Sequence, residues 1–160
     1  MTEDWFVKNV REMQWYDRGP RGKVALLNPD APQLGVNLFV LGPGEPMSMY
    51  HWEADQEDFL VLSGEALVVV NGEERPLRQW DFFHAPPHTA QVIVGAGSGP
   101  AVILAIGARE HQGSEDWGGY PLNDVAASHN AASEVETNDG KIAYARFPAR
   151  EPAPYGDWLP

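Results

Sequence analysis

The stretch His51-Trp52-Glu53-Ala54-Asp55-Gln56-Glu57, followed seven residues later by Gly64, carries the most information in this sequence. Side chains two apart on a β-strand share a face, so His51 and Glu53 are expected to point the same way. Glu57 can join them after a short turn. Imidazole and carboxylate groups are ligands of first-row divalent metals, so the stretch predicts a metal site inside a β-structure.

Short apolar runs separated by turn residues surround this stretch. They predict strands at residues 36–41, 59–62, 66–70, 73–77, 81–85, 91–94 and 101–108. Asn71-Gly72, between two of these runs, is a strong hairpin signal. Regular short strands with few helical patterns are typical of an antiparallel sandwich or barrel.

The flanks of this region are less regular. We expect one or two strands at residues 5–10 and 23–27, and one short helix at residues 121–129 with Pro121 in its first turn. After Phe147 the chain is rich in proline and is predicted to be irregular, held in place by its aromatic residues.

Composition limits the classes of function. The 160 residues fit one domain, and the absence of cysteine excludes disulfides and thiolate metal sites. A net charge of −12 disfavours nucleic acids and anionic membranes as partners. No apolar run is long enough to span a bilayer and the N-terminus lacks the pattern of a secretory signal, so we expect a cytoplasmic protein.

The spacing of Gly44, His51, Glu53, Glu57 and Gly64 resembles the first motif of the cupin superfamily. That motif is a glycine, about five residues, His-x-His, three or four residues, a glutamate, six residues and a glycine. This chain has six residues before His51, and Glu53 replaces the second histidine. The resemblance implies an all-β, single-domain jelly-roll: a double-stranded β-helix barrel with its core at residues 34–108. Strands at 1–33 and a short helix with an irregular tail at 109–160 would flank it.

The second cupin motif is only partly present. Aligned on Pro86, Gln91 stands where the family has its last histidine ligand. The resemblance therefore implies a metal held by His51, Glu53, Glu57 and Gln91. His88, three residues before Gln91, is a possible substitute ligand, and water could also complete the set.

These donors suit manganese, iron or nickel, and zinc remains possible. Without a metal, the two carboxylates are expected to repel each other and raise at least one pKa. The resemblance implies either a metal-dependent enzyme of oxygenase or isomerase type acting on a small molecule, or a non-catalytic small-molecule-binding protein with no or weakly bound metal. It extends to small bacterial single-cupin proteins with no assigned reaction. Phe59, Phe83 and Ile93 are expected to line the pocket.

The remaining candidates have structural interpretations. We expect packing roles for Tyr50, Trp52, Met47 and Met49, and surface or second-layer positions for His84, His111 and His129. Asp55 and Asp58 are interpreted as solvated loop charges. Val92 and Val94, on the strand face opposite Gln91, are expected to be covered by the N-terminal strands or by a second copy, so we predict a homodimer.

Overall fold

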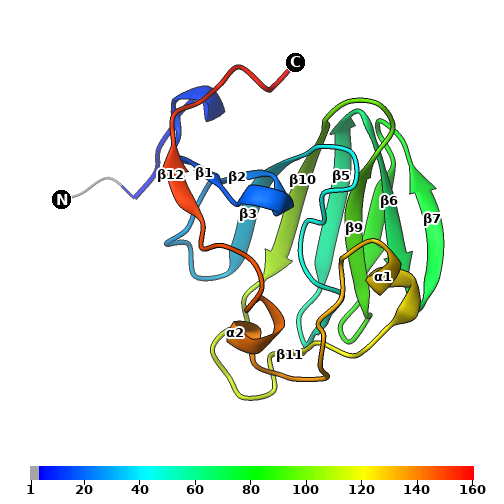
Figure 1. Cartoon of the computed structure of the whole chain (residues 1–160). Helices are drawn as coiled ribbons and strands as arrows, with labels where there is room; N and C mark the ends of the chain where they lie inside the picture. Colours follow the sequence, from blue (N-terminus) through cyan, green and yellow to red (C-terminus); the bar gives the residue numbers. More distant parts are fainter. Residues whose placement is uncertain (1–3) are drawn as a thin grey trace.

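Two antiparallel sheets face each other and enclose the main core, as the computed structural model shows for residues 4–160 (Figure 1). The seven-stranded sheet has the order β12 (Glu151–Ala153), β1 (Trp15–Asp17), β2 (Lys23–Leu26), β3 (Leu34–Leu41), β10 (Ala101–Ala108), β5 (Glu57–Ser63) and β8 (Phe82–Ala85). The three-stranded sheet has the order β7 (Glu73–Leu77), β6 (Glu65–Val70) and β9 (Gln91–Ala96). This is an all-β jelly-roll, as the sequence predicts.

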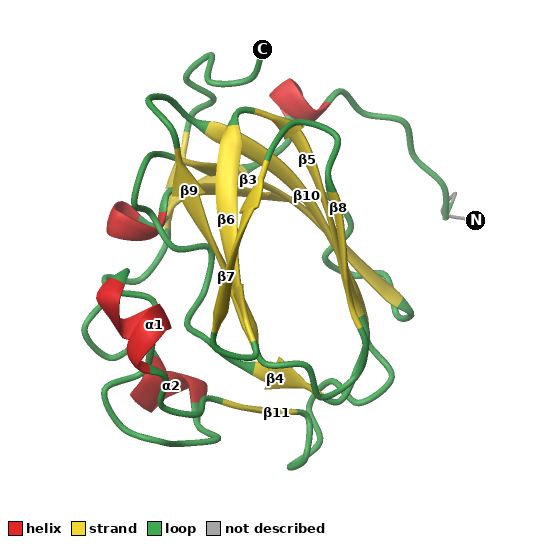
Figure 2. Ribbon diagram, turned by 90° about the vertical axis from the view of Figure 1, so that its right-hand side faces the viewer, coloured by secondary structure: helices red, strands yellow, loops and turns green. Residues whose placement is uncertain are grey.

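Smaller elements lie at one end of the barrel, near the bottom of Figure 2. β4 (Trp52–Glu53) pairs with β11 (Gly118–Gly119), and the helices α1 (Asp124–Ser128) and α2 (Gly140–Ala143) lie close by. Short 3-10 helices occupy Val10–Glu12 and Gly19–Arg21. No helix of residues 4–160 is long and apolar enough to cross a membrane.

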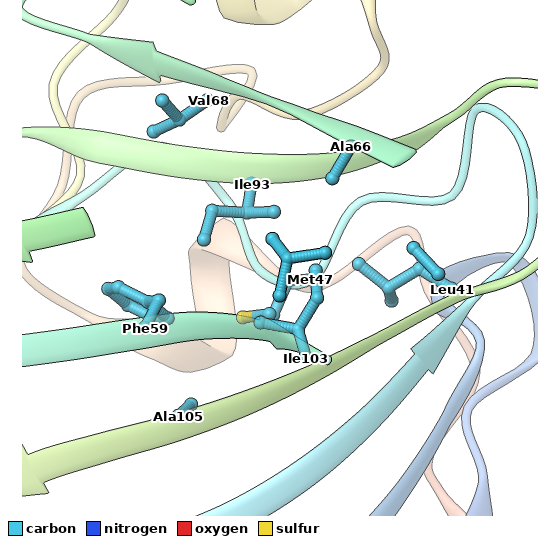
Figure 3. Packing of buried hydrophobic residues seen from close by; sticks show 10 residues of the cluster. Leu41, Met47, Phe59, Ala66, Val68, Ile93, Ile103 and Ala105 are labelled. Carbon is cyan, nitrogen blue, oxygen red and sulfur yellow. The ribbon is translucent and has the colours of Figure 1, made fainter. Parts of the chain in front are cut away.

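The barrel core forms because apolar side chains alternate along the strands that face it. On β5, Phe59 and Val61 point inward, and on β10 Ile103 and Ala105 do the same. Figure 3 shows Phe59 and Ile103 on the side of the core that faces Ile93 of the opposite sheet. The motif glycine Gly64 turns the chain between β5 and β6 at a φ of +77°, and a Cβ there would lie 2.3 Å from the Pro100 carbonyl oxygen. Only glycine fits this turn.

Two further apolar clusters cover the outer faces of the sheets. Trp15 packs with Leu38, Val40 and Val102 on the outside of the seven-stranded sheet. On the three-stranded sheet, Val92 and Val94 pack with Tyr50 and Val69. Three alanines of the C-terminal segment, Ala126, Ala131 and Ala132, pack in the same cluster.

The packing of the C-terminal segment on Val92 and Val94 corrects the expectation about what buries these two side chains. Neither the N-terminal strands nor a second copy is needed over Val92 and Val94, because the C-terminal segment already buries both side chains. The homodimer loses that support and stays a prediction. Tyr50 packs in the same outer cluster, and Met47 and Met49 are buried, as expected of packing residues.

The expected strands of the barrel are confirmed, but the flanks differ from expectation. Residues 5–10 form no strand, and Trp5, Phe6 and Val7 are exposed, whereas β1 and α2 are additional elements. The helix begins at Asp124 and not at Pro121, since the Asn123 side chain caps it by accepting from the Ala126 N–H. The tail contains the unexpected strand β12, although its aromatic anchoring is as predicted: Tyr155 and Trp158 pack on Trp15.

Candidate metal centre

Three side chains from neighbouring elements converge at one end of the barrel. His51 Nε2 lies 3.5 Å from Glu53 Oε1 and 3.5 Å from Glu57 Oε2. All three side chains are largely buried, with exposed fractions of 11, 18 and 15%. Ligands of a tetrahedral ion with bonds of about 2.1 Å lie roughly 3.4 Å apart, so the spacing fits a first-row divalent metal.

Backbone pairing places these side chains. The segment before β4 runs along β9: Met47 N–H donates to the Ile93 carbonyl, and His51 and Gln91 exchange both backbone hydrogen bonds. His51 therefore stands directly opposite Gln91. Glu53 follows on β4, and Glu57 opens β5.

The His51 ring is oriented for coordination. Its Nδ1–H donates to the Met49 carbonyl oxygen at 2.8 Å, so Nε2 is the ring nitrogen that faces the two carboxylates. A hydrogen bond on one ring nitrogen fixes the tautomer and orientation of a metal-binding imidazole. The ring is thus held ready without any rearrangement.

The imidazole and the two carboxylates shift one another's pKa values. Burial opposes charge on His51, but Glu57 and Glu53 outweigh it and raise the pKa of His51 well above its usual value. Burial, together with the Glu57 carboxylate, raises the pKa of Glu53 despite its hydrogen bond with His51. This agrees with the expected rise for one of the paired carboxylates.

Gln91 is buried beside the triad and contacts Glu57. Its Nε2 donates to Glu57 Oε2 at 3.0 Å, so in this structure the amide holds the carboxylate in place. His88 lies elsewhere: its side chain is exposed and its ring packs at 5.3 Å from the Trp52 ring. The turn after Pro86-Pro87, with His88 at a φ of +67°, directs the ring outward. The structure therefore contradicts the interpretation of His88 as a substitute ligand.

The triad borders a cavity of about 350 Å³, large enough for a small molecule. Phe59 lines this cavity, as expected. Phe83 and Ile93 do not: Phe83 stacks on Phe59 at 5.8 Å, and Ile93 fills the barrel core beside Met47 and Ile103 (Figure 3). The inward direction predicted for both side chains is correct. They fill the barrel core, whereas the cavity lies nearer the end of the barrel.

The flanks supply the rest of the cavity wall, which sequence reasoning missed. The Tyr120 ring lies 5.8 Å from the His51 ring and 5.7 Å from the Tyr144 ring. The Met49 N–H donates to the Tyr144 hydroxyl at 3.0 Å. Arg18 and Arg21, from the N-terminal flank, also line the cavity. No local pattern links these residues to the motif, because they meet it only in the folded chain.

The loop between Glu53 and Glu57 is held by a buried aspartate. Asp55 is nearly inaccessible and accepts from His111 twice, from the backbone N–H at 2.9 Å and from Nδ1 at 2.6 Å. The interpretation of Asp55 as a solvated charge is wrong, whereas His111 is exposed as expected. His84 is also exposed and pairs with Asp58, and His129 is half-buried and pairs with Glu74. The Asp55–His111 pair ties the donor loop to the segment that carries Tyr120.

This pair gives a pH-dependent prediction. The hydrogen bond with Asp55 raises the pKa of His111 above 6.5, so its charged form stabilises the fold below that pH, and the contribution is lost as pH rises through the folded-state pKa. We expect His111→Asn to lower the melting temperature at pH 5.5–6.5, with the difference shrinking at higher pH. Thermal unfolding of both proteins from pH 5.5 to about pH 8.5 measures it, since the upper end lies above the ordinary pKa of histidine. An equal difference at pH 5.5 and at about pH 8.5 would contradict the prediction.

Comparison with known proteins supports the assignment of the fold. A family model described as a cupin domain matches residues 37–107. No curated protein matches the chain. Among solved structures, a cupin 2 domain-containing protein of Halorhodospira halophila has 22% identity and a TM-score of 0.54 over 72% of this chain and 82% of its own, which shows a shared fold alone.

Two solved structures have higher identity. A protein of Acidithiobacillus ferrooxidans proposed to be a sugar phosphate isomerase is 27% identical, with a TM-score of 0.52, over 57% of this chain and 62% of its own. A sugar phosphate isomerase of the cupin superfamily from Silicibacter pomeroyi is 28% identical, with a TM-score of 0.50, over 54% and 59%. The chain thus spans less than two thirds of the length of either protein. The family match and the antiparallel barrel together identify residues 37–107 as a cupin domain.

Proposed function

We propose that the protein binds one divalent metal ion, manganese, iron, nickel or zinc, through His51, Glu53 and Glu57, and that it is a metal-dependent enzyme of oxygenase or isomerase type acting on a small molecule. The observation that carries the proposal is the convergence of His51 Nε2 with two carboxylate oxygens, each at 3.5 Å, beside a cavity. When bound, such an ion supplies a Lewis acid that polarises an oxygen of the ligand.

The donor set supports this proposal. One neutral imidazole and two carboxylates neutralise a divalent cation, and the fixed Nδ1–H of His51 presents the other nitrogen. Gln91 either completes the set through its amide oxygen or keeps its present contact with Glu57, in which case water is the fourth ligand. The isomerase type is favoured by the two structures above 25% identity, one a sugar phosphate isomerase and one proposed to be.

Tyr120 is placed to act on the bound molecule. Burial and the neighbouring Tyr144 raise the pKa of its phenol, so the hydroxyl stays protonated at neutral pH. It can therefore donate a hydrogen bond to a ligand oxygen near His51. The partly enclosed cavity wall formed by Phe59, Tyr120 and Trp117 limits the water that reaches this oxygen.

A non-catalytic small-molecule-binding protein with no or weakly bound metal is the second candidate. The observation that favours it is the position of His51, which in its protonated form pairs with both carboxylates. One positive charge then offsets part of the charge of the two carboxylates without an ion, and a metal must displace the proton to enter.

Elemental analysis separates the two candidates. Protein produced without a histidine tag is expected to retain about one equivalent of divalent metal after purification. Because the site forms only in the folded chain, the free energy of metal binding also stabilises the fold. Removal of the ion by a chelator should lower the melting temperature, and its return should restore it. Well under half an equivalent, with no rise in melting temperature on adding any of the four ions, would favour the second candidate.

A further inference from the structure

Arg21 presents an unpaired guanidinium to the cavity. It ends the Gly19–Arg21 turn, and its guanidinium carbon lies 4.6 Å from the centre of the Tyr144 ring. Its Nε is buried without a hydrogen-bond partner. Within residues 4–160, Arg21 forms no ion pair. The aromatic ring supports the group but does not neutralise it.

Arg18 places a second positive charge beside the first. It is 6% exposed, and its two terminal nitrogens donate to the carbonyl oxygens of Met47, at 2.7 Å, and of Arg21. Its Nε has no partner among the described residues. Burial, and then the charge of Arg21, lower the pKa of Arg18 to about 9, which still leaves it charged at neutral pH. Arg18 thus anchors the Arg21 backbone and adds to the local positive charge.

Arg18 is buried and Arg21 is half-buried, and neither forms an ion pair among the described residues, which is costly unless something pairs with them. The protein as a whole has a net charge of −12, so this local excess of positive charge is opposite in sign to the rest of the molecule. The cavity lining contains three arginines and two glutamates, and a divalent ion at the triad would make it more positive still. The charge distribution therefore favours a negatively charged occupant.

We propose that Arg21, supported by Arg18, binds the anionic group of a small organic acid or phosphate ester whose other end reaches the triad of His51, Glu53 and Glu57. A guanidinium is planar and presents its donors as a fork, which matches the oxygens of a carboxylate or phosphate. The inference rests on the proposed function for the second contact, the ligand oxygen at the metal, but the anion contact can be measured without it.

The aromatic side chains between the two ends define the shape of this ligand. His51, Tyr120, Tyr144 and Arg21 follow one another with separations of 5.8, 5.7 and 4.6 Å. This series joins the triad to Arg21, so we place the anionic group and the metal-bound oxygen at different ends of the ligand, with the tyrosines beside it. A hydroxy or oxo acid, or a phosphorylated polyol, has this arrangement.

Calorimetric titration of the full-length protein with inorganic phosphate and with acetate, at constant ionic strength, tests the anion contact. Each titration uses metal-free and manganese-loaded protein, so that coordination to the ion is separated from binding at Arg21. We expect one or both anions to bind the metal-free protein, and Arg21→Gln to weaken that binding at least about 10-fold, since a charge-assisted hydrogen bond is lost. The preferred anion identifies the group as phosphate or carboxylate.

Arg75→Gln is the control, because Arg75 is exposed on β7, pairs with Glu73 and lies outside the cavity. It should bind the anions like the wild type, while Arg21→Lys, which keeps the charge, should retain part of the affinity. Equal binding by the wild type and Arg21→Gln, or no anion binding in either form, would overturn the inference. Arg21-dependent binding in a protein that takes up no metal would leave this subsite standing and refute only the metal-dependent function.

Discussion

Replacing His51 with alanine is expected to weaken divalent metal binding by at least about 100-fold, since even residues that only orient a ligand contribute 10–100-fold. His51 is the only imidazole in the triad, and its Nε2 is the atom that both carboxylates face. Without it, Glu53 and Glu57 retain their mutual repulsion and lose their common partner. Calorimetric titration with zinc and manganese, together with elemental analysis of the purified variant, measures the loss.

The metal affinities of two further variants are compared with that of His51→Ala. His88→Ala should bind metal like the wild type, because the exposed ring packs on Trp52 and lies outside the site. Gln91→Ala should weaken binding about 10–100-fold if the amide acts by holding Glu57. Thermal unfolding of the metal-free proteins checks that each variant folds. A His51→Ala protein that retains metal as tightly as His88→Ala would refute the assigned triad.

Replacing Trp15 with alanine is expected to reduce the free energy of unfolding by about 3–5 kcal/mol, the usual cost of removing a large buried aromatic side chain. Trp15 is completely buried, and its ring meets Tyr155 at 5.8 Å and Trp158 at 5.3 Å. Its Nε1–H also donates to the Val10 carbonyl. One side chain therefore joins the N-terminal segment, the outer face of the sheet and the tail.

Denaturant unfolding of Trp15→Ala is best compared with Trp5→Ala. Trp5 is 69% exposed, so its replacement should change stability by no more than about 0.5 kcal/mol. Both variants lose one tryptophan, which keeps the fluorescence comparison fair. Equal stability losses would show that the outer cluster does not anchor the termini.

The barrel and its donor triad were predictable because their signals are local. Strands at 59–62, 66–70 and 101–108 follow from alternation and turn residues, and Asn71-Gly72 forms the hairpin that such a dipeptide favours. The spacing of His51 and Glu53 favours one face of an extended segment, and Glu57 follows after a short turn. The signals for these features lie within one strand or turn.

The flanks were not predictable because their structure depends on contacts distant in sequence. β12 forms only by pairing with β1, more than 130 residues earlier in the chain. In the sequence Asp55 resembles a solvent-exposed charge in a loop, and only the fold brings His111 to it. Tyr120, Tyr144 and Arg21 have no shared pattern that could have indicated a common cavity. Since β1 and β2 continue the barrel sheet and α1 covers its partner, we propose that the whole chain is one domain.

The division of the cavity between barrel and flanks has an evolutionary consequence. The three donors come from the cupin segment at 37–107, whereas Arg21, Tyr120 and Tyr144 come from outside it. Substitutions in the flanks can thus redirect the protein to a different molecule while the donors stay untouched. Related chains that keep the triad but differ in these three positions are expected to share a metal and to diverge in what they recognise.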